Sequence, residues 1–140
     1  MRVTNKTYKI KCKFTKIEWK EITITDNITI LGIDPGLQNT GWAVIKKLNN
    51  SYRFLDCGTI VTTTKEALQD RLAKINTELS KAVEKYKIQT ASIEETFVNK
   101  NNLSSLKLGH AKGAILLSLC LANIKATEYS AKQVKKSVVG

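Results

Sequence analysis

A short apolar run that stops at a turn is the feature that most constrains how this chain can fold. Residues 28–33 read ITILGI and are followed directly by Asp34, Pro35 and Gly36. An apolar run of this length, ended by Pro and Gly, is typical of a buried strand that stops at a tight turn. The rest of the chain must therefore supply neighbouring strands and helices that cover it.

The pattern after residue 36 predicts both. Residues 43–45 and 52–61 read as strands joined by a turn at 48–51, so the chain opens with a three-stranded meander. Apolar residues then recur at helical spacing from Leu68 to Tyr86. A strand at 91–94, a helix from Ser104 or Ser105 to about Ala122, and a strand at 125–129 complete the order βββαβαβ. This order predicts an α/β protein with a mixed sheet flanked by helices.

A chain of 140 residues that is 42% hydrophobic is expected to form one core. We divide it into a basic extension of uncertain structure, residues 1–27, and a domain over residues 28–140. The extension alternates at Ile10, Cys12 and Phe14, which fits an edge hairpin or a disordered tail equally well. No apolar run approaches the roughly 18 residues of a membrane span, and no secretory signal is recognisable, so we expect a cytoplasmic protein without membrane contact.

The charge of the chain is concentrated at its ends. The formal net charge is +11, and residues 98–140 hold seven basic residues against one acidic residue. Residues 28–97 hold nine basic and eight acidic residues and are nearly neutral. Clustered lysines favour a polyanionic partner such as nucleic acid, because binding releases counterions from phosphates. A solubilising surface is the alternative.

Two carboxylates follow predicted strands. Asp34 ends the first strand and Glu94 ends the strand at 91–94. If the two strand ends meet, they supply the hard oxygen ligands that Mg²⁺ or Mn²⁺ prefers, and such ions support phosphodiester hydrolysis. Asp34 alone fits an ordinary Asp-Pro-Gly turn, and Glu94 with Glu95 fits a solvated pair. The three cysteines form no CxxC pair, and with a single histidine this excludes the usual zinc spacings.

Three blocks of the sequence resemble successive blocks of the RuvC-type Holliday junction resolvases, which are structure-selective DNA endonucleases with an RNase H-like fold. The blocks are residues 30–45, 92–120 and 128–140, in the family's order and at about its spacing. The resemblance covers residues 28–140. It implies an RNase H-like sheet, Mg²⁺-dependent hydrolysis of four-way junction DNA, a homodimer, and a branch-migration helicase complex as a partner.

The resemblance also implies roles for individual residues. Asp34 matches the first metal-binding catalytic aspartate of the family, and Glu94 matches its second acid. Glu95 stands where the family commonly has Gln. Lys135 matches a lysine close to the scissile phosphate and is counted as catalytic. Phe97 matches a phenylalanine thought to insert at the junction centre, although a core position is the alternative. The residues expected to contact DNA are Phe97, Lys100, Lys107, Lys112, Lys132 and Lys135.

The helix that contains His110 has two possible partners. Gly109, Ala111, Gly113 and Ala114 make one stretch of it narrow. In the family this helix contributes to the homodimer, whereas packing against the chain's own sheet is the alternative. We interpret His110 as a surface or interface residue rather than a base.

The family completes its metal site with two acids on a C-terminal helix, but no Asp, Glu or His follows Glu128 here. We therefore expect half a metal site, weak or absent cleavage, and apolar sheet surface left uncovered. Asp56 and Glu128 match no ligand position of the family. The rival hypotheses are a non-catalytic junction-binding protein or inactive remnant, and an actin-like ATPase, which would need a second nucleotide-binding lobe.

Overall fold

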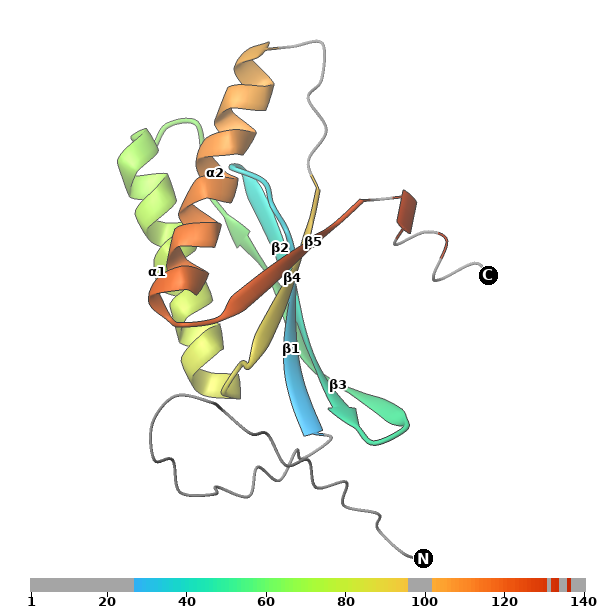
Figure 1. Ribbon diagram of the computed structural model, residues 1–140. Helices are drawn as coiled ribbons and strands as arrows, with labels where there is room; N and C mark the ends of the chain where they lie inside the picture. Colours follow the sequence, from blue (N-terminus) through green and yellow to red (C-terminus); the bar gives the residue numbers. More distant parts are fainter. Residues whose placement is uncertain (1–26, 96–101, 131, 134–135, 137–140) are drawn as a thin grey trace, which may run out of the picture.

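A five-stranded mixed sheet with two helices on one face is the framework of the computed structural model, which describes residues 27–95, 102–130, 132–133 and 136 (Figure 1). The predicted order βββαβαβ is confirmed. The strands are β1 (Asn27–Asp34), β2 (Asn39–Leu48), β3 (Ser51–Val61), β4 (Thr90–Glu94) and β5 (Lys125–Tyr129). The helices are α1 (Leu68–Tyr86) and α2 (Asn102–Leu121). The first 26 residues, and with them the expected extension, lie outside the described residues.

The central strand β1 organises the sheet, whose spatial order is β3-β2-β1-β4-β5. β1 pairs antiparallel with β2 and parallel with β4, and β4 pairs parallel with β5. β2 is longer than predicted, because residues 39–42 and 46–48 carry little apolar alternation and yet pair with strands on both sides. Pairing with two neighbours, rather than side-chain pattern, therefore sets the length of this strand.

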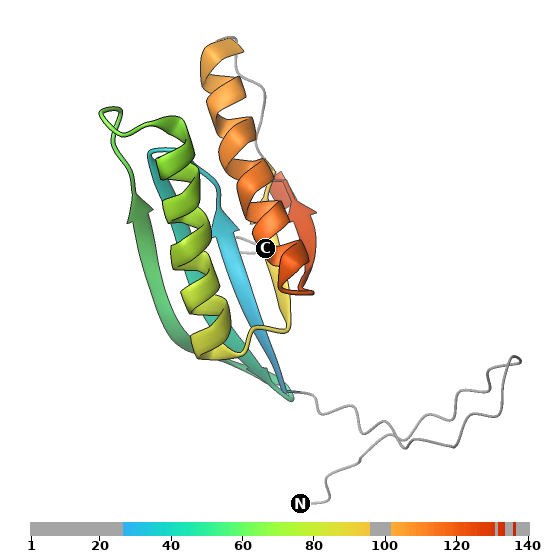
Figure 2. The same ribbon diagram turned by 90° about the vertical axis from the view of Figure 1, so that its left-hand side faces the viewer.

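The two faces of the sheet differ in cover. Leu31 and Ile33 of β1 are buried on the face that packs against α1 and α2 (Figure 2), together with Ile75 and Leu79 of α1 and Ile115 and Leu119 of α2. A fully buried Leu or Ile side chain contributes about 1.5–3 kcal/mol, so this face holds most of the stabilising burial.

The alternate residues of β1 point to the opposite face, which we call the open face. Within the described ranges no helix covers it. Phe54 and Tyr52 of β3 are 62% and 67% exposed, and the register places both on this face. Within the described residues, these two side chains leave apolar surface of the sheet exposed. Neither described helix combines the length and apolar content that a membrane crossing requires.

The turn after β1 is held by a chain of hydrogen bonds. Thr40 Oγ1 donates to the carbonyl oxygen of Gly36 at 2.6 Å, and a side chain on Gly36 would overlap the backbone of Asn39. Thr62 Oγ1 donates to the Leu37 carbonyl oxygen at 2.5 Å and accepts from Nε of buried Arg71 at 2.8 Å. The turn is thus anchored to the first part of α1, which fixes where Asp34 ends its strand.

A second polar contact ties the end of α1 to β3. The Tyr86 hydroxyl donates to Oδ2 of Asp56, and Lys85 Nζ lies 3.6 Å from the same oxygen. The hydrogen bond from Tyr86 is the largest cause that holds the pKa of Asp56 below its ordinary value of 3.8. Asp56 pairs in register with buried Val44, so its side chain lies on the helix-covered face.

We predict that Tyr86→Phe destabilises the protein in a pH-dependent way. Because the pKa of Asp56 is depressed in the folded state, its stabilisation is present above about pH 3.8 and is lost as pH falls through the lower folded pKa. The urea midpoint of the variant should fall below that of the parent at pH 6, and the gap should narrow towards pH 2.5. Tyr52→Phe, at an exposed tyrosine, is the control and should show no gap. A gap that stays constant across this range would contradict the assignment.

Candidate active site at the ends of β1 and β4

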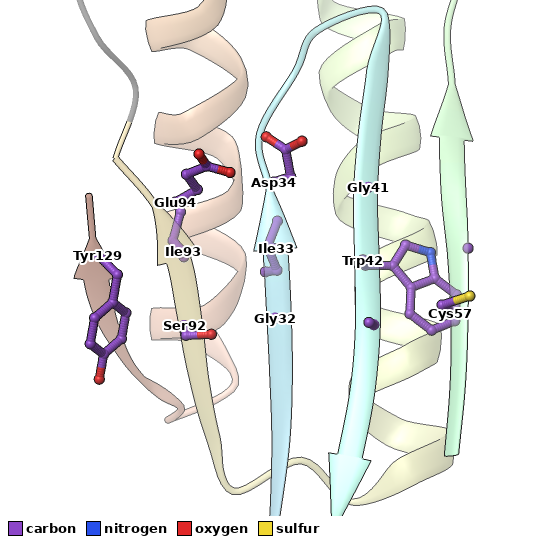
Figure 3. A pocket seen from close by; sticks show the side chains of 12 residues that line it. Gly32, Ile33, Asp34, Gly41, Trp42, Cys57, Ser92, Ile93, Glu94 and Tyr129 are labelled. Atoms are coloured by element: carbon purple, nitrogen blue, oxygen red, sulfur yellow. The ribbon is translucent and has the colours of Figure 1, made fainter. Parts of the chain in front are cut away.

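The parallel register of β1 and β4 brings two carboxylates to one place. Ile33 pairs with Ile93, so Asp34 and Glu94, the next residues, end neighbouring strands at the same level. Because side chains alternate along a strand, both project to the open face. Figure 3 shows the two carboxyl groups at the same end of a pocket on that face. The two strand ends are therefore neighbours in the sheet, which is the condition that the metal-site hypothesis required.

The pocket is a shallow cavity of about 460 Å³. Small residues form its floor, because Gly32 of β1, Gly41 of β2 and Ser92 of β4 place almost no side-chain volume there. Gly41 lies directly opposite Asp34 in the β1–β2 register, so no neighbouring side chain covers the aspartate from that strand. The aspartate is exposed and Glu94 is partly buried. Tyr129 of β5 forms the wall beside Glu94.

The donor set suits a hard divalent cation. Two carboxylates on a wide, solvent-open floor offer the oxygen ligands of Mg²⁺ or Mn²⁺ and leave room for waters in the remaining positions. In the described part of the chain, no group of three or more His, Cys, Asp or Glu side chains gathers around a possible metal position. A cation held there would therefore have two carboxylate ligands from the described residues.

Two other acids are excluded as ligands of this pocket by the side of the sheet they occupy. Glu128 pairs in register with buried Ile93, and its Oε2 atom forms an ion pair with Nζ of Lys112 on α2 at 2.5 Å. Asp56 is bound to Tyr86 on the same helix-covered face. The sheet thus separates both from Asp34. Glu95 is exposed, and its backbone N–H donates to the carbonyl oxygen of Tyr129 at 2.8 Å.

The expected DNA contacts fall into three groups. Phe97, Lys100 and Lys135 lie outside the described residues, so their roles stay predictions. Lys107 on α2 and Lys132, three residues beyond β5, are exposed. Lys112 is 19% exposed at its side chain, and its ammonium group is held by Glu128. This ion pair makes Lys112 the least accessible of the described lysines that were predicted to contact phosphate.

Sequence analysis did not identify Tyr129, Ser92 or Gly41 as parts of this site. Tyr129 was predicted only as the end of a strand. Its proximity to Glu94 depends on the β4–β5 pairing between residues 35 positions apart, which no local pattern contains. The signal that could have found it is its place at the end of the next parallel strand, where side chains converge with those of β4.

Comparison with known proteins identifies close relatives. The family model described as crossover junction endodeoxyribonuclease RuvC matches residues 30–140. The crossover junction endodeoxyribonuclease RuvC of Ehrlichia ruminantium is 47% identical over 116 residues, which cover 81% of this chain and 72% of the relative. The solved structure of Thermus thermophilus RuvC aligns with a TM-score of 0.72 and 26% identity, over 81% of this chain and 70% of that chain.

A second solved structure, T. thermophilus RuvC in complex with Holliday junction substrate, aligns with a TM-score of 0.74. Its identity is 24%, and the match covers 81% of this chain and 71% of that chain. The two structural matches bear out the expected RNase H-like arrangement of the sheet and its helices.

We predict that Asp34→Asn and Glu94→Gln each weaken Mn²⁺ binding by about tenfold or more, because affinity depends on the number of charged ligands. The parent should bind with a dissociation constant on the order of 10⁻³ M, as expected of a site with few ligands. Free Mn²⁺ in a titration can be measured by electron paramagnetic resonance. Glu78→Gln removes an exposed carboxylate of α1 and should leave the binding unchanged. Equal losses in all three variants would indicate diffuse charge attraction instead of a site.

Proposed function

The chain belongs to the RuvC family of crossover junction endodeoxyribonucleases, and from this membership we propose that it binds four-way junction DNA and hydrolyses its phosphodiester bonds. The observation that carries the proposal is the register of β1 and β4, which sets Asp34 and Glu94 in one open pocket. The pocket is wide and shallow, which suits a polymer backbone better than an enclosed small molecule.

The proposed metal ion is Mg²⁺, with Mn²⁺ as the alternative, and its ligands are Asp34 and Glu94. When bound, such an ion supplies the Lewis acidity that phosphodiester hydrolysis needs. Two bare carboxylates would repel a phosphate. Exposed Lys107 and Lys132 therefore have a separate task, which is to attract the DNA backbone.

Lys135 and Phe97 complete the proposal on the family resemblance alone. Lys135 would contact the scissile phosphate, and Phe97 would stack at the junction centre. A cytoplasmic location and association with a branch-migration helicase complex are proposed on the same basis, as is the division of the chain at residue 27.

We expect the parent to bind a four-way junction at least about tenfold more tightly than a linear duplex of the same sequence, measured by gel-shift titration in Ca²⁺. In Mg²⁺ it should cut the junction slowly. Asp34→Asn should keep the binding and lose about a hundredfold or more of the cutting rate, since even outer-shell changes at metal sites cost about 10–100-fold. Glu78→Gln is the matched control.

Two outcomes of this experiment would contradict the proposal in different ways. Selective binding without any cutting by the parent would identify a junction-binding protein that is not an enzyme. Equal affinities for the junction and the duplex would contradict junction recognition itself.

The outer side of α2 supports a homodimer. Leu106, Leu117 and Leu121 are 57%, 60% and 75% exposed, and at helical spacing they share one stripe. Methyl groups added at Gly109 or Gly113 would meet no atom within 4 Å, so a second helix can approach closely there. Ala111 is fully buried against the chain's own core. The small residues of α2 therefore serve intramolecular packing on one side and leave the other side available.

We predict that Leu117→Glu raises the dissociation constant of the dimer by about thirtyfold or more, which corresponds to the roughly 2 kcal/mol of a central interface side chain. Sedimentation velocity over a concentration series measures it. Leu68→Glu, at a 40% exposed leucine of α1, is the control. A monomeric parent, or a dimer that Leu117→Glu leaves intact, would contradict an α2 interface.

A further inference from the structure

Tyr129 is an exposed aromatic residue on the strand next to Glu94, and the proposed metal site does not use its side chain. It is the last residue of β5 and pairs in register with Glu94. It is 42% exposed and forms a wall of the pocket. Figure 3 shows its ring along the same face of the sheet as Glu94, on the side of β4 away from Asp34. Neighbouring strands lie about 5 Å apart, so the backbone of Tyr129 lies roughly 5 Å from β4, which carries Glu94, and roughly 10 Å from β1, which carries Asp34.

The backbone that carries this ring is fixed from both sides. The carbonyl oxygen of Tyr129 accepts the backbone N–H of Glu95 at 2.8 Å. The next residue, Ser130, donates from its own backbone N–H to Gln133 Oε1 at 2.8 Å, and Gln133 N–H donates back to Ser130 Oγ at 3.3 Å. This reciprocal pair of bonds has the pattern of a helix N-terminus and holds Ser130 close to Gln133. The ring is therefore presented on a rigid strand end.

The aromatic side chains Trp42 and Tyr52 of the sheet and Tyr86 of α1 have other surroundings. The ring centroids of Trp42 and Tyr86 lie 6.5 Å apart on the helix-covered face. The Tyr86 hydroxyl donates a hydrogen bond to Asp56. Among the described residues, the structure gives Tyr129 neither an aromatic neighbour nor a hydrogen bond from its hydroxyl. Tyr52 is exposed too, but it lies at the opposite end of the sheet from the carboxylates. Within residues 27–95 and 102–130, only Tyr129 combines an exposed ring with a place beside Glu94.

We propose that Tyr129 is a positioning residue that stacks on an unpaired nucleobase next to the phosphate at Asp34 and Glu94. The inference rests on the proposed function, because it presupposes that a DNA strand crosses this pocket. A base is available for stacking only where its own neighbours have released it, as at a junction or in a single strand. Tyr129 therefore favours an unpaired nucleotide at the pocket and adds structure selectivity to a charge-based contact with the backbone.

The test uses an oligonucleotide that carries the fluorescent base 2-aminopurine, as a single strand and within a four-way junction, with Ca²⁺ in place of Mg²⁺. The parent should quench the fluorescence on binding. Tyr129→Ala should lose the quenching and bind the single strand about tenfold more weakly, within the range of one base–aromatic stack. Tyr129→Phe should keep both properties, because the ring alone is needed. Tyr52→Ala is the matched control and should behave as the parent does.

Tyr129→Leu separates stacking from packing, since it keeps apolar volume without an aromatic face. It should lose the quenching as Tyr129→Ala does while the circular dichroism spectrum stays that of the parent. A strand with an abasic site in place of the reporter base should bind the parent and Tyr129→Ala equally. Quenching and affinity at the parent level in Tyr129→Leu would overturn the inference. If the parent protein binds the four-way junction and the duplex with equal affinity, the proposed function is overturned. The titration with the single strand would still test the role of Tyr129.

Discussion

The parallel pairing of β1 with β4 is the constraint on which the rest of this structure depends. It aligns Ile33 with Ile93, and the same register buries both under the helices and sends Asp34 and Glu94 to the opposite face. A slip of β4 by one residue would turn Glu94 into the core and Ile93 into water. The cost of burying an unpaired charge opposes that alternative. Stability and chemistry are therefore fixed by one choice of register.

The sheet also separates two kinds of polar interaction. On the helix-covered face, acids serve structure: Asp56 is bound to Tyr86 and Glu128 to Lys112. On the open face, Asp34 and Glu94 stand over a floor of glycine and serine and have no ion-pair partner among the described residues. The four acids at strand positions therefore divide into two pairs, one bound to residues of the helices and one exposed at the pocket. The division could not be read from their spacing along the chain.

Charge and shape act at different ranges. The net charge of +11 favours approach to any polyanion and carries no structural selectivity. Selectivity requires groups at fixed positions beside the pocket. The ring of Tyr129 and the open floor of the pocket are at such positions, since both belong to strands of the sheet. Residues 28–97 hold nine basic and eight acidic residues, so the segment that carries Asp34 and Glu94 adds almost nothing to the net charge.

The sequence by itself determined the element order, the α/β class, and Asp34 and Glu94 as candidate ligands. The element order and the class follow from local apolar periodicity and from turn chemistry such as Asp-Pro-Gly, which depend on neighbouring residues alone. The role of the two acids as ligands came from the resemblance of three sequence blocks to a known family. The length of β2, the place of Tyr129 beside Glu94 and the capture of Lys112 by Glu128 were decided only by the tertiary structure. Each depends on pairing between strands, or on packing of a helix against a strand, at separations where no local pattern operates. The open face illustrates both: alternation along β1 predicts two faces, but only the packing of α1 and α2 decides which one is left for the site.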